Sequence, residues 1–426
     1  MPSSCIWYIS KYMGMPSGRV GTRPFLLMRE LAKLGHGVHI FTSDANHLVK
    51  APEFEGPSTT QVFDGVPMTW VRTHKYSGVN SLGRIISWFD FERRLWRLPK
   101  GAFRRPDAVI VSSLSLLTIV NGLRLRRRYG CRLIFEVRDI WPLTLVEEGG
   151  LSPRNPFVWA LGVVERLAYR RADAIVGTMP NLKQHVHELI GPSPPVYCIP
   201  MGIEQAQIEG AEPLSAGYVE KYIPPDKFRV CHAGTIGMTN ALDTLFEAAR
   251  ALRERTDIQF LIIGEGELKA HYEAVCADLP NVSFLPAVPK PMLQSVLKRC
   301  DLLYFATHRS KVWDYGQSLN KVIDYMLAGR PIVASYSGYP SMIDESGSGT
   351  FVPAGDVSAL VNEILRYRAM TPEEREAKGV AAREWLVRNR TYDRLARQYL
   401  ELALGEKAVH LQSAVPDVPS YAQHSV

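Results

Sequence analysis

The sequence predicts an α/β protein of two domains, each built from parallel β-α-β units. The chain has 426 residues, which is more than one hydrophobic core usually organises, so we expect two domains. Residues 5–42 and residues 228–263 both follow the order strand, glycine-bearing turn, helix, strand. A strand that returns through a crossover helix to a second strand is the parallel unit of doubly wound sheets.

The composition indicates a globular protein with an acidic partner. Hydrophobic residues make up 46% of the chain and aromatic residues 10%, which excludes a disordered protein. The six cysteines are scattered without a C-x-x-C pair, so we expect a reducing compartment and no structural zinc site. A formal net charge of +7 favours an acidic partner such as anionic lipid, pyrophosphate or nucleic acid.

We also expect a cytoplasmic protein without a membrane span. The chain enters a predicted strand at residue 5 with no charged region before it, so no secretory signal is expected. The longest uncharged run, residues 108–123, is too short to cross a bilayer and contains several polar residues.

Taken in order, the first half alternates strands and helices. Strands are expected at residues 5–10, 38–42, 107–113, 132–137, 174–178 and 196–199, and helices at 24–34, 116–129, 155–171 and 181–190. Residues 44–83 are polar and hold at most a short hairpin around Gly65. Residues 204–225 are polar, contain three prolines and are expected to be a linker.

The loop after the first strand is a candidate ligand loop. Gly14 and Gly18 let backbone N–H groups approach a ligand, and Arg19 adds positive charge. The glycine spacing differs from the G-x-G-x-x-G dinucleotide fingerprint. The alternative is a loop shaped only for tight turning.

Residues 84–105 combine basic and large apolar side chains. The segment carries seven arginines and lysines together with two tryptophans and three phenylalanines, and only two carboxylates oppose the cations. Such a helix is typical of an interfacial membrane anchor, so we expect contact with an anionic membrane. The alternative is an ordinary core-facing helix with a solvated basic side.

The most informative stretch is residues 314–335, where a polar loop precedes a helix and a buried strand. We expect Asn320 to cap the helix. Lys321 lies in the first turn, where the helix dipole does not favour a cation, so its position indicates a phosphate ligand. Asp324, one turn later, can accept two hydroxyl groups of one ribose. The alternative is a surface helix with a Lys/Asp pair.

These residues resemble the nucleotide-sugar signature of retaining glycosyltransferases with the GT-B fold, in particular glycosyltransferase family 4. The run D-Y-M-L-A-G-R-P-I-V matches the family pattern, and Asp324 holds its second acidic position. Gly316 stands where the family usually has its first Glu. Ser318, Asn320 and Lys321 fit a subgroup of bacterial polysaccharide transferases.

Other blocks resemble the same family in the same order. They are E-V-R-D-I-W-P (136–142), E-E-G-G-L (147–151), I-P-M-G-I-E (199–204), H-A-G-T-I-G (232–237) and L-I-I-G-E-G-E-L (261–268). The resemblance implies two Rossmann-like domains facing each other across a cleft. Residues 1–205 would bind the acceptor, residues 206–385 would bind the donor, and residues 386–426 would form a C-terminal helix that crosses back and a flexible tail.

The resemblance also implies roles for individual residues. Donor-binding residues would be Gly14, Gly18, Arg19, Gly234, Thr235, Gly237, Gly264, Gly266, Val288, Ser318, Asn320, Lys321 and Asp324. Acceptor-binding residues would be Arg138, Asp139 and Glu147, and catalytic residues Asp139, Lys321 and Asp324. For Asp139, a cap or turn role is the alternative. Because no D-x-D is placed to hold a metal diphosphate, we expect no metal and no cofactor; the nucleotide sugar is a substrate.

The expected activity is transfer of a hexosyl or N-acetylhexosaminyl group, with retention, from a nucleotide-diphosphate sugar, with UDP as the expected nucleotide. The acceptor would be lipid-linked or a saccharide, in synthesis of bacterial surface polysaccharide such as lipopolysaccharide O-antigen, at the inner face of the cytoplasmic membrane. The alternatives are a non-hydrolysing sugar-nucleotide 2-epimerase of the same fold and a nucleic-acid binder. No recognised nucleic-acid module accompanies the basic segments.

Overall fold

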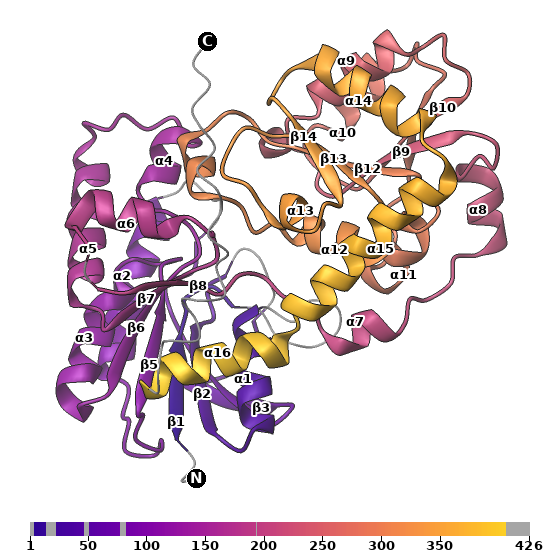
Figure 1. Ribbon diagram of the computed structural model, residues 1–426. Helices are drawn as coiled ribbons and strands as arrows, with labels where there is room; N and C mark the ends of the chain where they lie inside the picture. The colour runs from indigo at the N-terminus through magenta and orange to yellow at the C-terminus, as the bar shows by residue number, and fades with distance from the viewer. Residues whose placement is uncertain (1–3, 14–22, 47–50, 77–81, 193, 406–426) are drawn as a thin grey trace.

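The computed structural model describes residues 4–13, 23–46, 51–76, 82–192 and 194–405. Within these ranges the chain forms two separate sheets, each with helices on both faces, and so two domains (Figure 1). The two-domain α/β architecture predicted from the sequence is confirmed.

The N-terminal half of the chain forms the first sheet. In the described ranges its strand order is β3-β4-β2-β1-β5-β6-β7-β8, and each neighbouring pair except β3–β4 is parallel. The strands are β1 (Cys5–Ile9), β2 (Gly37–Ser43), β3 (Ser58–Phe63), β4 (Val66–Val71), β5 (Ala108–Ser112), β6 (Arg132–Val137), β7 (Ala174–Gly177) and β8 (Val196–Cys198). The hairpin expected around Gly65 joins β3 to β4, and both turn residues, Asp64 and Gly65, have positive φ, as a type I′ hairpin turn requires.

Side chains along each strand point alternately to the two faces of the first sheet, and the helices of this domain cover both faces. They are α1 (Arg23–Lys33), α2 (Leu82–Arg97), α3 (Thr118–Tyr129), α4 (Leu143–Glu147), α5 (Pro156–Arg171) and α6 (Leu182–Ile190). Ile6 and Tyr8 of β1 pack with α1 and the C-terminal helix α16 (Tyr392–Leu404). Trp7 and Ile9 pack with α2, α3, α5 and α6. The segment predicted over 84–105 is helical only as far as Arg97.

The second sheet is parallel throughout the described ranges, in the order β11-β10-β9-β12-β13-β14. Its strands are β9 (Phe228–Ala233), β10 (Ile258–Ile263), β11 (Val282–Leu285), β12 (Leu302–Ala306), β13 (Ile332–Ser335) and β14 (Gly349–Val352). The α-helices are α9 (Asp243–Ala251), α10 (Lys269–Val275), α11 (Lys290–Leu297), α12 (Asn320–Ala328), α13 (Met342–Glu345), α14 (Val357–Ala369) and α15 (Pro372–Asn389), and the 3-10 helices are η1 (Met238–Asn240) and η2 (Lys311–Tyr315).

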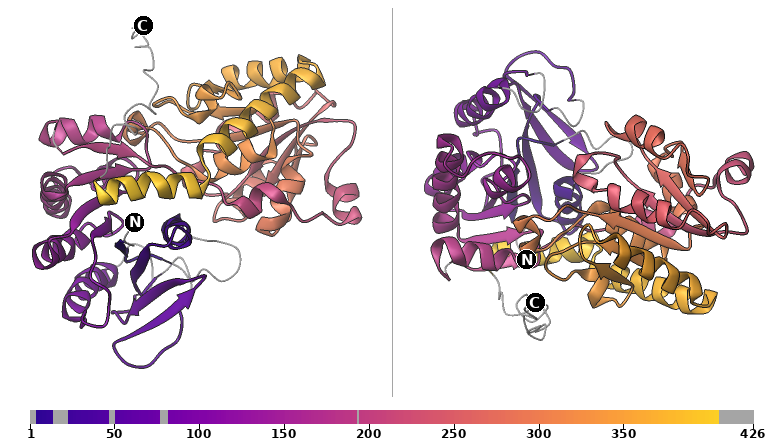
Figure 2. Two further views of the ribbon diagram at one scale, coloured as in Figure 1. Left: turned by 60° about the horizontal axis from the view of Figure 1, so that its bottom comes forward. Right: turned by 90° about the horizontal axis from the view of Figure 1, so that it is seen from above.

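The chain passes between the domains at two places that lie side by side. The outgoing segment, expected to be linker, contains the short helices α7 (Gln205–Glu209) and α8 (Ala216–Tyr222). On the return, α15 packs on α12 and α16 packs on α1. Figure 2 shows these yellow helices running from the second domain to the first. The N–H of Ile203 donates to the carbonyl of Arg390, and the N–H of Tyr392 donates to the carbonyl of Ile203. The predicted boundary at residue 386 falls inside α15.

A buried ion pair lies beneath both crossings. Arg23, the first residue of α1, pairs with Glu136 of β6, and neither side chain is exposed. Arg23 also donates to the carbonyls of Ile199 and Pro200, just before the outgoing segment. The hydroxyls of Tyr8 and of Tyr399 on α16 donate to Glu136. Burial by itself would raise the pKa of Glu136, but Arg23 and the other donors hold it below its ordinary value.

We predict that Glu136→Gln strongly destabilises the protein, because it leaves the buried charge of Arg23 without its counter-charge. Breaking a buried pair in this way costs about 3–5 kcal/mol, measured here as the change in urea-induced unfolding. Glu363→Gln is the matched control, since its pair with Arg366 is partly exposed and is worth about 0–1 kcal/mol. Equal losses in the two variants would contradict the role assigned to Glu136.

Candidate functional site

At the carboxyl edge of the second sheet, Lys321 lies beside the glycine turn that follows β9. Its Nζ donates to Oδ1 of Asn240 in η1. A Cβ built on Gly234 would lie 3.6 Å from the same Nζ. The first turn of α12 and the Gly234 turn therefore meet around one ammonium group. Burial lowers the pKa of Lys321 to about 8.

The glycines of the two turns on this edge are required by close packing of the turns on each other. A Cβ on Gly264 would lie 1.8 Å from the carbonyl oxygen of Gly234, and one on Gly266 would lie 2.1 Å from that of Ile236. The N–H groups of Gly234 and Ile236 donate to the carbonyls of Ile263 and Glu265. The N–H of Gly234, a predicted donor-binding residue, is thus already used within the fold.

Asp324 lies on α12, and its side chain is only 10% exposed. Both carboxylate oxygens accept hydrogen bonds from Nζ of Lys290, the first residue of α11. Burial raises the pKa of Asp324, and Lys290 opposes that effect. Sequence reasoning missed Lys290, although a cation in the first turn of a helix was the same signal that pointed to Lys321.

Other predicted donor residues have different partners from those expected. The helix begins at Asn320 with Leu319 in the cap position, so the prediction of an Asn320 cap was wrong. Ser318 accepts a hydrogen bond from the N–H of Met201 in the segment that joins the domains. Val288 is half-buried and packs at the edge of the second-domain core. Gly14, Gly18 and Arg19 lie outside the described residues.

The segment before α12 is held by the first domain. Tyr315 of η2 lies in the first-domain core, and its hydroxyl donates to Glu188 of α6. Gly316 has φ +92° and ψ 179°, which is essentially restricted to glycine. A Cβ there would lie 2.6 Å from the ring of Pro180. The structure therefore excludes a Glu at this position.

On the first-domain side, the predicted acceptor residues follow β6. Asp139 accepts hydrogen bonds from Nε1 of Trp141 (2.7 Å) and from Oγ1 of Thr144 (2.5 Å), so its carboxylate orders the start of α4. Arg138 precedes it and is half-buried. Glu147, at the end of α4, accepts from the N–H of Lys311 in the second domain at 3.3 Å.

Glu148 and Lys11 add charged groups near this edge. Burial and the charge of Asp139 raise the pKa of Glu148, whereas His308 of the second domain lowers it, so Glu148 lies within electrostatic reach of both domains. Lys11 follows β1, is fully buried and donates to the carbonyl of Ala45 at 3.1 Å. Burial, followed by the charge of Arg84, lowers the pKa of Lys11 to about 7. No sequence pattern singled out Lys11.

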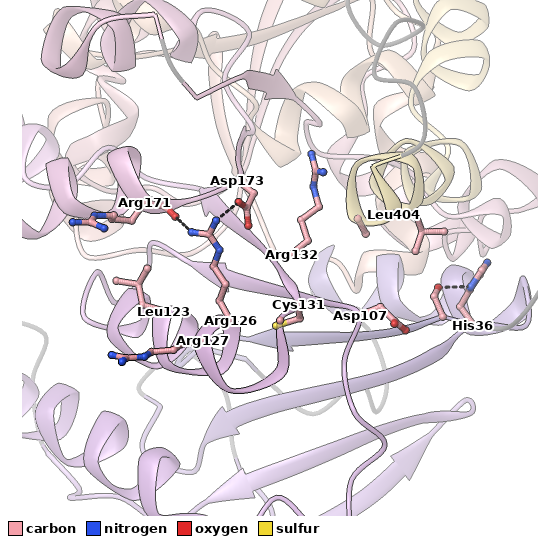
Figure 3. A pocket seen from close by; sticks show the side chains of 13 residues that line it. His36, Asp107, Leu123, Arg126, Arg127, Cys131, Arg132, Arg171, Asp173 and Leu404 are labelled. Carbon is pink, nitrogen blue, oxygen red and sulfur yellow. Dashed lines mark hydrogen bonds and ion pairs between the residues drawn. The ribbon is translucent and has the colours of Figure 1, made fainter.

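A cavity of about 1040 Å³ lies at the opposite, amino edge of the first sheet, between the ends of α3, α5 and α16 (Figure 3). Arg126 crosses it to pair with Asp173 at 2.6 Å and to donate to the carbonyl of Arg171 at 2.9 Å. None of the predicted site residues lines this cavity. Ligands of doubly wound sheets bind at the carboxyl ends of strands, so we place the candidate site there and not in the cavity.

The described residues contain no group of three or more His, Cys, Asp or Glu side chains arranged to hold a metal ion. In the same part of the chain, every helix is too short or too polar to cross a bilayer.

Comparison with known proteins identifies both halves of the chain. Residues 20–202 match the family described as glycosyl transferase 4-like domain, and residues 227–370 match glycosyl transferases group 1. A GDP-mannose-dependent α-(1-6)-phosphatidylinositol monomannoside mannosyltransferase of Mycolicibacterium smegmatis is 24% identical over 259 residues, which are 58% of this chain and 68% of that protein. The amylovoran biosynthesis glycosyltransferase AmsK of Erwinia amylovora is 27% identical over 143 residues, 32% of this chain and 35% of that protein.

Among solved structures, a sucrose-phosphate synthase from Thermosynechococcus elongatus superposes with a TM-score of 0.70 at 18% identity. The superposition covers 94% of this chain and 98% of the synthase. The two-domain arrangement is thus the GT-B fold that the resemblance implied.

We predict that Gly316→Ala destabilises the protein more than Gly355→Ala. Gly355 also has positive φ (+82°), but a Cβ there would meet no atom within 4 Å, so its substitution reports backbone strain of about 1–3 kcal/mol alone. Gly316→Ala adds the contact with Pro180 and should cost more. Urea-induced unfolding measures the loss of unfolding free energy in both variants. Equal losses would contradict the prediction, because the contact between residue 316 and Pro180 would then have relaxed at no cost.

Proposed function

Because glycosyltransferase family models match both halves of the chain and the fold is GT-B, this protein is a glycosyltransferase, and we propose that it uses a nucleotide-diphosphate sugar bound at the α12 edge of the second domain. The observation that carries the proposal is the position of Lys321 beside the Gly234 turn. The basic residue that the family usually has after this turn is absent, since Met238, Thr239 and Asn240 stand there. Lys321 places a cation at that point from another element and bonds to Asn240.

The proposed chemistry is transfer with retention of configuration. As the bond to the leaving diphosphate breaks, negative charge grows on the diphosphate and the anomeric carbon becomes oxocarbenium-like. Lys321 stabilises that charge, and a partly buried ammonium does so more strongly than one in water. Asp324 binds the ribose, and closure of the domains excludes water that would hydrolyse the donor. The transferred group is a hexosyl or N-acetylhexosaminyl group, and no metal takes part.

The acceptor is proposed to lie against the first domain, at Arg138, Asp139 and Glu147. Asp139 is oriented by Trp141 and Thr144, so it can accept a hydrogen bond from an acceptor hydroxyl in a fixed direction. A lipid-linked or saccharide acceptor in bacterial surface polysaccharide synthesis is supported by the names of the two curated relatives, one acting on a phosphatidylinositol mannoside and one in amylovoran biosynthesis. The 2-epimerase alternative has no such support, because both family models describe glycosyltransferases.

A peripheral membrane contact, at the inner face of the cytoplasmic membrane, is proposed for the outer side of α2, α3 and α5. This three-helix face exposes the apolar side chains Leu82, Ile86, Phe89, Trp96, Val120, Trp159, Val163 and Leu167. The three helices carry eleven arginines and only three carboxylates. Asp90 is 13% exposed and pairs with Arg93 and Arg94 of its own helix, Glu92 accepts from Thr118 and Asn121, and Glu165 pairs with His185.

Exposed aromatic and aliphatic side chains among arginines that outnumber the carboxylates suit the surface of an anionic bilayer. The apolar groups enter the interface while the guanidinium groups stay near lipid phosphates. A second copy of the chain docked through the same face would place arginines against arginines, and the like charges would repel. The face extends the segment predicted from the sequence, residues 84–105, by the apolar row of α5.

The donor class is tested by thermal unfolding with UDP, GDP, dTDP and ADP and with their sugars. A nucleotide at 100 times its Kd stabilises the protein by about 2.7 kcal/mol, and we expect a selective response, to UDP first. Asp324→Asn should weaken binding of that nucleotide by about 1–3 kcal/mol, because it weakens a charged hydrogen bond. The response should not change in excess EDTA. If no nucleotide or nucleotide sugar of the panel stabilised the protein, the donor assignment would be overturned.

Membrane contact is tested by sedimentation with anionic and neutral vesicles. Phe89→Ser with Trp159→Ser should weaken binding to anionic vesicles, and Arg93→Gln with Arg97→Gln should cost about 1 kcal/mol, or roughly fivefold, per arginine. Val380→Ser, which removes an exposed apolar side chain from α15, is the control and should have no effect. If either double variant bound anionic vesicles as tightly as the unchanged protein, the proposed face would be contradicted.

A further inference from the structure

The ion pair between Lys290 and Asp324 joins two helices at the proposed donor edge. Lys290 contacts both carboxylate oxygens. One turn later on α11, Nε2 of Gln294 donates to the main-chain carbonyl of Asp324 at 3.0 Å. Two neighbouring side chains of α11 therefore fix both the backbone and the carboxylate of one residue of α12.

The local sequence does not explain Lys290. It is the first residue of α11, lies between Pro289 and Pro291, and has no acidic residue in the same turn. A cation in this position is disfavoured by the helix dipole. Its side chain is 37% exposed, whereas that of Asp324 is 10% exposed. Lys290 thus lies between the buried carboxylate of Asp324 and solvent. Its pairing with Asp324, which is distant in the sequence, accounts for the position of Lys290.

We propose that Lys290 is a positioning residue for donor binding: it holds the Asp324 carboxylate charged and oriented so that the remaining lone pairs accept the two hydroxyls of a ribose. This inference rests on the proposed function. A carboxylate offers about four acceptor sites, and Lys290 occupies one on each oxygen. About one site on each oxygen remains, which matches two adjacent hydroxyl groups.

The surroundings of Asp324 contain few other charges that act on it. Burial raises its pKa and Lys290 lowers it. On α12 itself, Nζ of Lys321 is bound to Asn240, and Tyr325 is a buried phenol whose pKa is raised, mainly by burial. The helix α15 packs on the far end of α12, and its Lys378 and Arg383 donate to carbonyls of Gly347 and Ile208.

This arrangement predicts how pH acts on a variant without the lysine. Removing Lys290 leaves burial unopposed, so the pKa of Asp324 rises further and the carboxyl is protonated closer to neutral pH. A protonated carboxyl has lost the charge that makes the hydrogen bonds to the ribose strong. Nucleotide affinity of the variant should therefore be low at mildly acidic pH and should recover as the pH rises.

The test measures binding of UDP and GDP by calorimetry between about pH 6 and pH 9, with inorganic pyrophosphate as a probe that lacks the ribose. Lys290→Met should weaken binding of the preferred nucleotide by about tenfold or more at the acidic end of the pH range, which is the order of one charge-assisted hydrogen bond. The loss of affinity should be smaller at the alkaline end. Lys290→Arg should retain most of the affinity. Pyrophosphate binding should change much less. Lys33→Met is the control, since it removes a lysine from an exposed pair with Glu30.

The outcomes separate this inference from the proposed function. Nucleotide binding by Lys290→Met that equals or exceeds that of the unchanged protein, with the same pH profile, overturns the positioning role and leaves the donor site intact. An equal loss for pyrophosphate also overturns it, because Lys290 would then act on the phosphates. If the unchanged protein binds neither nucleotide, the proposed function fails and this inference fails with it.

Discussion

The buried pair between Arg23 and Glu136 determines how the two domains are joined. Its two side chains are unexposed, and the groups around them come from α1, β1, β6, α16 and the segment that leaves the first domain. A charge at this depth is stable only when each of its hydrogen-bonding positions is filled. The outgoing segment and the returning helix are therefore held at the same point of the first domain.

At the donor edge, too, charged side chains pair with groups from other elements. Two lysines and one aspartate come from α11 and α12, and each lysine occupies a first turn where its charge is disfavoured. Each is compensated by a partner on a different element, Asp324 for Lys290 and Asn240 for Lys321. These three side chains together carry one net positive charge, which suits a diphosphate, while the carboxylate remains available to neutral hydroxyl groups.

Much of the fold could be predicted from the sequence because it depends on local pattern. Apolar runs and turn signals predicted β1, β2 and β5 to β10 closely, and the hairpin around Gly65 corresponds to β3 and β4, but β14 was not predicted. The partners at the site could not be predicted in this way. Lys290 and Asp324, or Gly316 and Pro180, are far apart in the chain, and only the folded arrangement brings them together. The Asn320 cap was wrong because Leu319 takes the cap position and Ser318 is used by Met201.

The anchoring of Tyr315 in the first domain turns residues 316–319 into a tether. Tyr315 is buried in the first-domain core, and α12 begins at Asn320 in the second domain. Five chain steps separate these residues, and an extended chain covers at most about 18 Å in that distance. However the domains rotate, the first turn of α12 stays within that radius of the first-domain core. The domains can hinge about this point, but on this side they cannot separate by more than the tether allows.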